Sequence, residues 1–256
     1  MSSNQLALRP TYWASVSGGK DSLYMLNFIL HHLDRYPLHG VVHFELEIDF
    51  PFVHRVIDYM ESECKRFGIP FYRIKPRVSW FDLYERHGFP MRKVRWCNDH
   101  YKMDSLQQLK DFMAERGCSV ISYIGYCADE KDRADGEEQS KQKNIYPLIE
   151  NGVMEDTILE WAKTQPIFND YYKFNRRCGC MWCPLASMDN HAYLLYYYPK
   201  EYEQMMELAR RTEIQRTKEL GRPFSVWQGN PKYDTVYRDA RIRSYYLPKL
   251  IKSLSA

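Results

Sequence analysis

The sequence has no long apolar run. None of its stretches approaches the roughly 20 apolar residues that a membrane-spanning helix needs. The first ten residues, MSSNQLALRP, also lack the basic segment followed by an apolar one that marks a secretory signal. With 45% hydrophobic and 27% charged residues, the composition is that of a globular chain. We therefore expect a cytoplasmic protein without a membrane partner.

The sequence also lacks a strong excess of positive or negative charge. The formal net charge of +3 over 256 residues is too small to indicate nucleic-acid binding by itself. From Pro199 to the end, however, there are 12 Lys and Arg against seven Asp and Glu, a net of +5, so the rest of the chain is near −2. This basic C-terminal region indicates a nucleic-acid or protein partner, with a solvated helical surface as the alternative. The oligomeric state is left open, and an oligomer is compatible with the sequence.

Strands and helices alternate through the first 165 residues. Short apolar strands are predicted at 12–16, 38–46, 71–74, 119–125 and 145–148. Helices are predicted at 21–33, 52–67, 100–116 and 154–163. This alternation predicts an α/β fold, a doubly wound parallel sheet covered on both faces. Residues 166–256 should form a smaller helical appendage around a cysteine cluster, with helices at 189–220 and 239–254.

The segment Ser17-Gly18-Gly19-Lys20-Asp21-Ser22 lies between the first strand and the first helix. Two glycines allow a tight turn and a close approach of backbone to a ligand. The helix that follows offers unpaired N–H groups and the positive end of its dipole, and Lys20 and the two serines add donors. These donors converge on one anion. The segment is not a Walker A loop, which requires G-x-x-x-x-G-K-[ST].

SGGKDS is the signature of the PP-loop (N-type) ATP pyrophosphatases, and the chain resembles that family. It is most similar to the branch around phosphoadenosine-phosphosulfate reductase, which includes accessory proteins of DNA phosphorothioation and type IV CRISPR systems. Further motifs of that branch are matched by Glu45 to Pro51 (with Glu47 in place of a glycine), by Arg95-Trp96-Cys97 with Lys102, by Gly125, Asp129, Glu130 and Arg133, and by Tyr146-Pro147-Leu148.

The resemblance implies the adenine-nucleotide α-hydrolase form of the sheet and an enzyme that cleaves ATP, with Mg²⁺, to AMP and pyrophosphate. Such an enzyme adenylates an acceptor, often before sulfur insertion. It implies catalytic roles for Lys20, Asp21 and Arg133. The nucleotide would be bound by Ser15, Ser17, Gly18, Gly19, Lys20, Asp21, Ser22, Glu45, Asp49, Arg95, Lys102 and Glu130.

Three cysteines lie within six residues, at Cys178, Cys180 and Cys183. A tetrahedral sulfur site needs four thiolates, and the resemblance suggests Cys97 as the fourth. Cys97 precedes a predicted helix, whose N-terminus should lower the pKa of the thiol. Relatives in DNA phosphorothioation favour a [4Fe–4S] cluster, and Zn²⁺ is the alternative. The other three cysteines (Cys64, Cys118 and Cys127) lie in apolar settings and are predicted to be core thiols.

Two other functions fit parts of the sequence. A non-catalytic ATP-binding accessory subunit would need the loop but no turnover. A sulfonucleotide reductase would need a nucleophilic cysteine in its C-terminal segment, and no cysteine follows Cys183.

Overall fold

The computed structural model describes residues 8–138, 143–227 and 230–255. Within them the chain forms two compact units. The first comprises residues 8–46, 51–77 and 103–169, and the second comprises residues 47–50, 78–102 and 170–255. The segments 47–50 and 78–102 therefore belong with the C-terminal region, although they precede the boundary predicted near residue 165. No helix in these ranges is long and apolar enough to cross a membrane. The expectation about a secretory signal concerns residues that lie mostly outside the described part.

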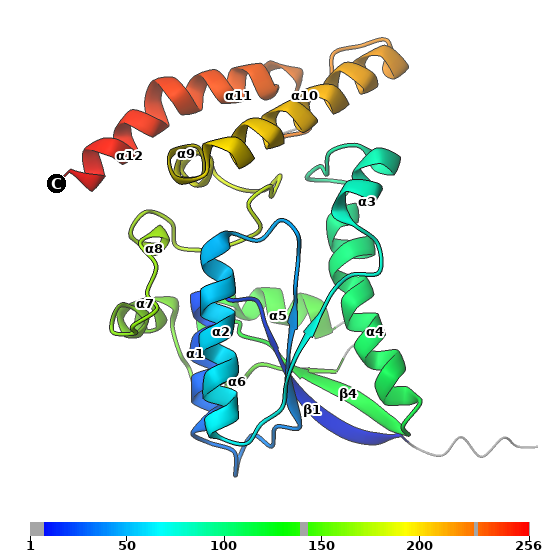
Figure 1. Ribbon diagram of the computed structural model, residues 1–256, viewed down its shortest axis with the longest axis vertical. Helices are drawn as coiled ribbons and strands as arrows, with labels where there is room; N and C mark the ends of the chain where they lie inside the picture. The colour runs from blue at the N-terminus through cyan, green and yellow to red at the C-terminus, as the bar shows by residue number, and fades with distance from the viewer. Residues whose placement is uncertain (1–7, 139–142, 228–229, 256) are drawn as a thin grey trace, which may run out of the picture. The chain divides into compact units, whose positions relative to one another are not determined.

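The first unit is built on a five-stranded sheet (Figure 1). The strands are β1 (Arg9–Val16), β2 (Gly40–Phe44), β3 (Phe71–Ile74), β4 (Cys118–Tyr123) and β5 (Asn144–Ile145). All neighbouring strands are parallel, in the order β3-β2-β1-β4-β5. The predicted α/β fold is confirmed. Because the chain order reverses between β1 and β4, the carboxyl ends of these two strands form the switch point where such sheets bind ligands.

Helices cover both faces of this sheet. The helices α1 (Lys20–Leu30) and α2 (Pro51–Arg66) lie on one side, and α4 (Met103–Ala114) lies on the other (Figure 1). Under α4, a core forms from Trp13, Val42, Leu109, Met113 and Cys118. The unit is completed by a 3₁₀ turn at Ala128–Glu130 and by α5 (Lys131–Glu138), α6 (Pro147–Glu150) and α7 (Glu155–Lys163).

The predicted fifth strand and the helix predicted over 100–116 differ from the observed elements. The fifth strand stops at Ile145, because Pro147 lacks an N–H for the sheet and opens the short helix α6 instead. The helix predicted over 100–116 is divided between a π-helical turn at Cys97–Lys102, which belongs to the second unit, and α4 in the first.

The second unit is helical. It contains α3 (Trp80–His87), α8 (Tyr171–Phe174), α9 (Met188–Tyr197), α10 (Pro199–Leu220), α11 (Thr235–Arg241) and α12 (Leu247–Leu254). A 3₁₀ turn at Pro231–Tyr233 precedes α11, and a π-helical turn at Ile242–Tyr246 joins α11 to α12. The single helix predicted over 189–220 is broken at Pro199, which has no N–H and begins α10.

Candidate functional site

The loop between β1 and α1 requires glycine at position 18. Gly18 has φ +74°, a left-handed conformation, and a Cβ there would lie 2.7 Å from Cγ1 of Val53 on α2. The loop therefore turns tightly against α2, at the carboxyl end of β1.

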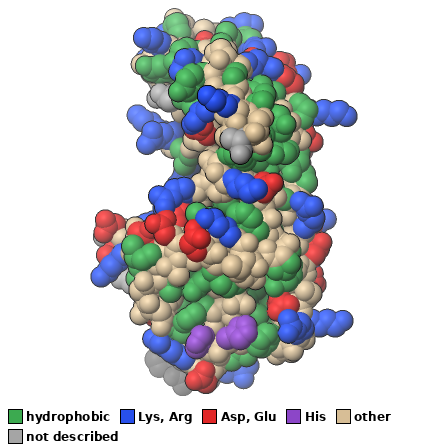
Figure 2. All heavy atoms as spheres, turned by 90° about the vertical axis from the view of Figure 1, so that its left-hand side faces the viewer, with side chains coloured by type: hydrophobic (Ala, Val, Ile, Leu, Met, Phe, Trp, Pro, Cys, Tyr) green, Lys and Arg blue, Asp and Glu red, His purple; other side chains and the backbone are tan. Residues whose placement is uncertain are grey.

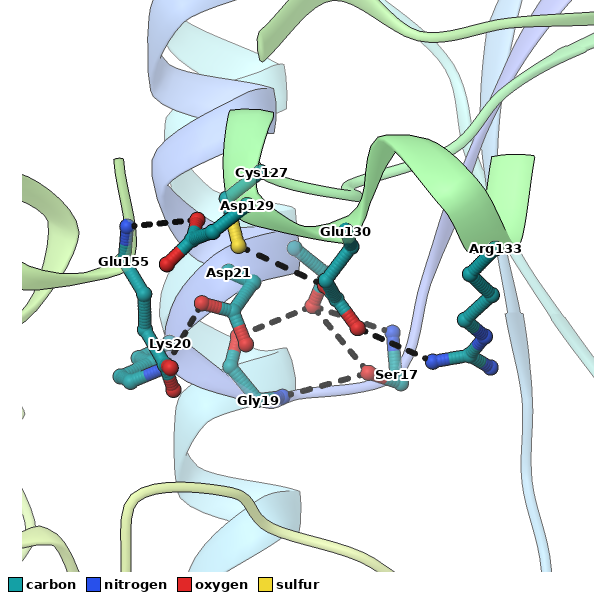
Figure 3. A network of polar contacts seen from close by, with 10 residues as sticks. Ser17, Gly19, Lys20, Asp21, Cys127, Asp129, Glu130, Arg133 and Glu155 are labelled. Atoms are coloured by element: carbon teal, nitrogen blue, oxygen red, sulfur yellow. Dashed lines mark hydrogen bonds and ion pairs between the residues drawn. The ribbon is translucent and has the colours of Figure 1, made fainter. Parts of the chain in front are cut away.

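Two serine hydroxyls hold the loop in this shape, and Figure 3 shows the one of Ser17 beside Gly19. The N–H of Ser17 donates to Oγ of Ser22 at 3.2 Å, and that hydroxyl donates to the carbonyl of Gly19 at 2.9 Å. The N–H of Gly19 lies 3.4 Å from Oγ of Ser17. In this conformation both hydroxyls contact the backbone of the loop and stabilise its turn.

The segment just after β4 packs closely against the same loop. A Cβ on Gly125 would lie 3.1 Å from the carbonyl oxygen of Asp21 and 3.2 Å from Cα of Ser22. The carboxyl ends of β1 and β4 thus meet at the first turn of α1. The N–H groups of that turn have no acceptor within the helix, so the position suits an anion.

The side chain of Lys20 is 1% exposed and does not extend into solvent. Its ammonium donates to Oδ1 of Asp21 at 2.7 Å and to Oε1 of Glu155, at the start of α7, at 3.1 Å (Figure 3). The sequence predicted Lys20 as a phosphate cation but did not predict Glu155. The two residues are 135 positions apart, and an acid at a helix N-terminus is too common a pattern to indicate such a partner.

The turn after β4 brings further acids to this region. The N–H of Glu155 donates to Oδ1 of Asp129 at 3.1 Å. Glu130 forms an ion pair with Arg133 at 3.2 Å and accepts from the Cys127 thiol at 3.4 Å. The predicted residues Glu130 and Arg133 therefore lie together. Burial raises the pKa of the Asp21 carboxyl, Lys20 lowers it, and Glu155 and Glu130 raise it.

The remaining predicted nucleotide ligands are divided between the two units. Ser15 lies on β1, half-buried. Glu45 follows β2, where it forms an ion pair with Lys75 at 3.6 Å. Asp49, Arg95 and Lys102 belong to the second unit.

Trp80 of α3 is the centre of an aromatic cluster beside the cysteines of the second unit. Its ring is fully buried and packs against Trp182 at 5.0 Å and against Trp96 at 5.4 Å, measured between ring centroids. Trp96 directly precedes Cys97, and Trp182 directly precedes Cys183. The tilted and edge-on contacts of these indoles therefore bring two distant cysteine segments together.

The thiols of Cys180 and Cys183 act electrostatically on the thiol of Cys97. Burial, followed by the nearby Cys180 and Cys183, raises the pKa of the Cys97 thiol to about 11, although Lys102 and Arg95 act in the opposite direction. The expectation that a helix N-terminus lowers this pKa is therefore wrong, because burial outweighs it. The charge of Cys180 raises the pKa of Lys102, which also donates a hydrogen bond to that sulfur. The remaining cysteines (Cys64, Cys118 and Cys127) are buried, as predicted.

The side chains of the cysteine loop are of a chemical type that binds metals, but their arrangement is not that of a metal site. Among the described residues, no group of three or more His, Cys, Asp or Glu side chains is arranged to hold a metal ion. The donors are nevertheless soft thiols of the kind that bind iron–sulfur clusters and zinc. A cavity of about 150 Å³, lined by Cys178, Cys180 and Cys183, leaves room beside them.

The basic residues of the C-terminal helices are partly neutralised. Arg243 forms ion pairs with Asp239 and Glu203, and Lys249 forms one with Asp189 at 2.9 Å. On the face shown in Figure 2, Lys and Arg side chains are spread among apolar and acidic ones.

The fold and the loop define a nucleotide-binding α/β protein, and comparison with known families agrees. The family model of the phosphoadenosine phosphosulfate reductase domain matches residues 11–186. The chain belongs to this family, which confirms the resemblance predicted from the motifs; the phosphorothioation or CRISPR branch stays a prediction.

Two uncharacterised proteins of Methanocaldococcus jannaschii are related to this chain. One is 24% identical over 228 residues, which are 85% of this chain and 52% of the relative. The other is 26% identical over 208 residues, which are 76% of this chain and 40% of the relative. The chain therefore spans about half the length of the curated relatives it matches.

Two solved structures are similar at 16% identity. The U34-tRNA thiolase NcsA from Methanococcus maripaludis, with its [4Fe-4S] cluster, has a TM-score of 0.40 over 80% of this chain and 72% of its own. The phosphoadenylyl-sulfate reductase from Candida auris, in a phosphate complex, has a TM-score of 0.37 over 64% of this chain and 77% of its own.

Proposed function

We propose that this protein cleaves ATP to AMP and pyrophosphate and thereby adenylates an acceptor, in sulfur transfer or nucleic-acid modification. The observation that carries the proposal is the loop around Gly18, where backbone turns against α2 at the sheet's switch point. Membership of the phosphoadenosine phosphosulfate reductase domain family supports a nucleotide as the ligand.

The loop can stabilise a departing pyrophosphate mainly by electrostatics. The first-turn N–H groups of α1 are oriented before the ligand arrives, so they need no reorganisation when charge develops on the leaving group. Carboxylates also lie nearby. Mg²⁺ is usually held by one or two carboxylates together with substrate phosphates, so Asp21 is suited to contact the Mg²⁺ that accompanies ATP.

Nucleotide products test this proposal. Full-length protein, purified anaerobically, is incubated with ATP and Mg²⁺, and the nucleotides are separated by chromatography. We expect AMP and pyrophosphate in equal amounts and no ADP. ADP as the main product would refute cleavage between the α and β phosphates. Tight ATP binding without any product would favour an accessory subunit instead.

We further propose that Cys97, Cys178, Cys180 and Cys183 hold a [4Fe–4S] cluster. The proposal is supported by the packing of Trp96 and Trp182 on Trp80 and by the effect of Cys180 and Cys183 on the pKa of the Cys97 thiol. Such a cluster would bind the loop before α9 to the π-helical turn at Cys97–Lys102 and so stabilise the second unit.

Iron content tests the ligand set. Anaerobically purified Cys97→Ala should lose iron, acid-labile sulfide and the cluster's visible absorbance. Cys64→Ala is the matched control, because Cys64 is a buried thiol on α2 whose pKa is raised to about 12 by burial. Equal iron in the Cys97 variant and the parent would remove Cys97 as a ligand. Zinc without iron would identify the alternative metal.

A further inference from the structure

Glu155 is the acid that completes the charge arrangement at the phosphate loop. It is the first residue of α7 and is 7% exposed. Its Oε1 accepts from the ammonium of Lys20 at 3.1 Å, and the same ammonium donates to Asp21 at 2.7 Å (Figure 3). Asp21 is therefore linked to α7 through one buried cation.

A second bond holds Glu155 from its backbone. Its N–H donates to Oδ1 of Asp129, in the turn after β4, at 3.1 Å. The N–H of Ala128 donates to the carbonyl of Val153, just before α7, at 2.8 Å. Because its backbone is bonded on the β4 side, Glu155 can hold Lys20 in a defined place.

We propose that Glu155 is a positioning residue of the nucleotide site, which acts through Lys20 to hold the Asp21 carboxylate at the N-terminus of α1. The inference rests on the proposed ATP chemistry and deepens it. Without Glu155, Lys20 would have one carboxylate partner fewer within the first unit, and its ammonium and Asp21 could shift together.

The charge of Glu155 also bears on the protonation of Asp21. Among the described residues, the charged groups that act on Asp21 include Lys20 on α1, Glu155 on α7 and Glu130 in the turn after β4, and the titratable thiol of Cys127 also faces it. Glu155 and Glu130 raise the pKa of Asp21, and Lys20 lowers it. Glu155→Gln keeps an oxygen that can accept from Lys20 but removes one negative charge, so the pKa of Asp21 should fall.

Four proteins separate positioning from a merely structural role: the parent, Glu155→Gln, Glu155→Ala and Glu160→Gln. Glu160 is the matched control, since it lies on the same helix but is exposed and forms a local ion pair with Lys163 at 2.6 Å. Mg²⁺-ATP affinity is measured by calorimetry from pH 5 to 8. AMP formation is measured over the same range, with kcat and KM determined separately.

For Glu155→Gln we expect the acid limb of both profiles to move to lower pH, with kcat on the plateau within about threefold of the parent. For Glu155→Ala we expect kcat to fall about tenfold to a hundredfold, as small misplacements do, with a smaller change in KM. Glu160→Gln should superimpose on the parent.

Two results would overturn the inference in distinguishable ways. If the parent cleaves ATP and both Glu155 variants match the control in kcat and in acid limb, the positioning role is wrong and the proposed function stands. If the parent neither binds nor cleaves ATP, the proposed function falls, and this inference falls with it.

Discussion

Gly18 is a position in the loop where an added side chain should be poorly tolerated. Its φ of +74° is unfavourable for any side chain, and an added Cβ would lie 2.7 Å from Val53 and 3.5 Å from Ile57. Alanine in the left-handed region costs about 1–2 kcal/mol, and forced overpacking adds about 1–3 kcal/mol. We therefore expect Gly18→Ala to lower the free energy of unfolding of the first unit by about 2–5 kcal/mol.

Gly68 provides the matched control. It follows α2 with φ +69°, but nothing lies within 4 Å of the position its Cβ would take. Gly68→Ala should therefore carry only the conformational cost, about 1–2 kcal/mol. Adding Val53→Ala to Gly18→Ala removes the crowding, so the double variant should be less destabilised than the sum of the single ones, by about 0.5–3 kcal/mol.

Thermal unfolding and ATP turnover report on these variants together. One kcal/mol corresponds to about 2–4 °C in Tm for a chain near this size. Gly18→Ala should therefore lose more Tm than Gly68→Ala, and it alone should lose turnover because its loop is displaced. Equal losses of Tm in the two variants, with equal turnover and no relief from Val53→Ala, would refute the assignment of this loop.

Two further predictions concern charges in the first unit. Asp21→Asn should reduce ATP turnover about a hundredfold with little change in Tm. Lys20→Ala should reduce turnover and also lower the free energy of unfolding by about 3–5 kcal/mol, because it leaves two carboxylates without their shared cation. Turnover at the parent's rate in both variants would contradict the role of this ion pair. Burial lowers the pKa of His43 below 6.5, so below that pH the unfolded chain binds a proton that the folded one does not. The free energy of unfolding should then fall with decreasing pH, by up to about 1.4 kcal/mol per pH unit. Thermal unfolding measured from pH 5 to 8 should show this slope in the parent and in His32→Gln, the control at an exposed histidine. His43→Gln should show a shallower slope.

Local patterns predicted most of the first unit. Apolar runs and helical periodicity reveal strands and helices because each depends on nearby residues, and the two glycines reveal the turn for the same reason. The helix α3 was missed although it carries a local signal. Ser79 caps it by accepting from the N–H of Phe81, and Asp82 stands three residues on, a common start for a helix.

The division of the chain into units could not be read from local patterns. The segment 47–50 joins the second unit through contacts with residues far along the chain. The carbonyl of Ile48 accepts from Met181, and Phe50 packs on Tyr171. Trp80 likewise packs against both Trp96 and Trp182, which lie about 85 residues apart in the sequence. The spacing of Cys178, Cys180 and Cys183 suggests a centre, but only this packing shows why Cys97 is near it.

The difference between local patterns and long-range packing also applies to the loop motif. Ser17 to Ser22 set the place of the proposed anion site, because a strand end, two glycines and a helix start are the features that such a site needs. They do not determine the charge that an anion would meet there. That charge depends on Glu155 and Glu130, which reach the loop only because α7 and the turn after β4 pack beside α1. Since Lys20 is already bonded to two carboxylates, a phosphate at this loop meets acids as well as donors. A cation that accompanies the nucleotide would therefore matter more for binding than the lysine in the motif suggests.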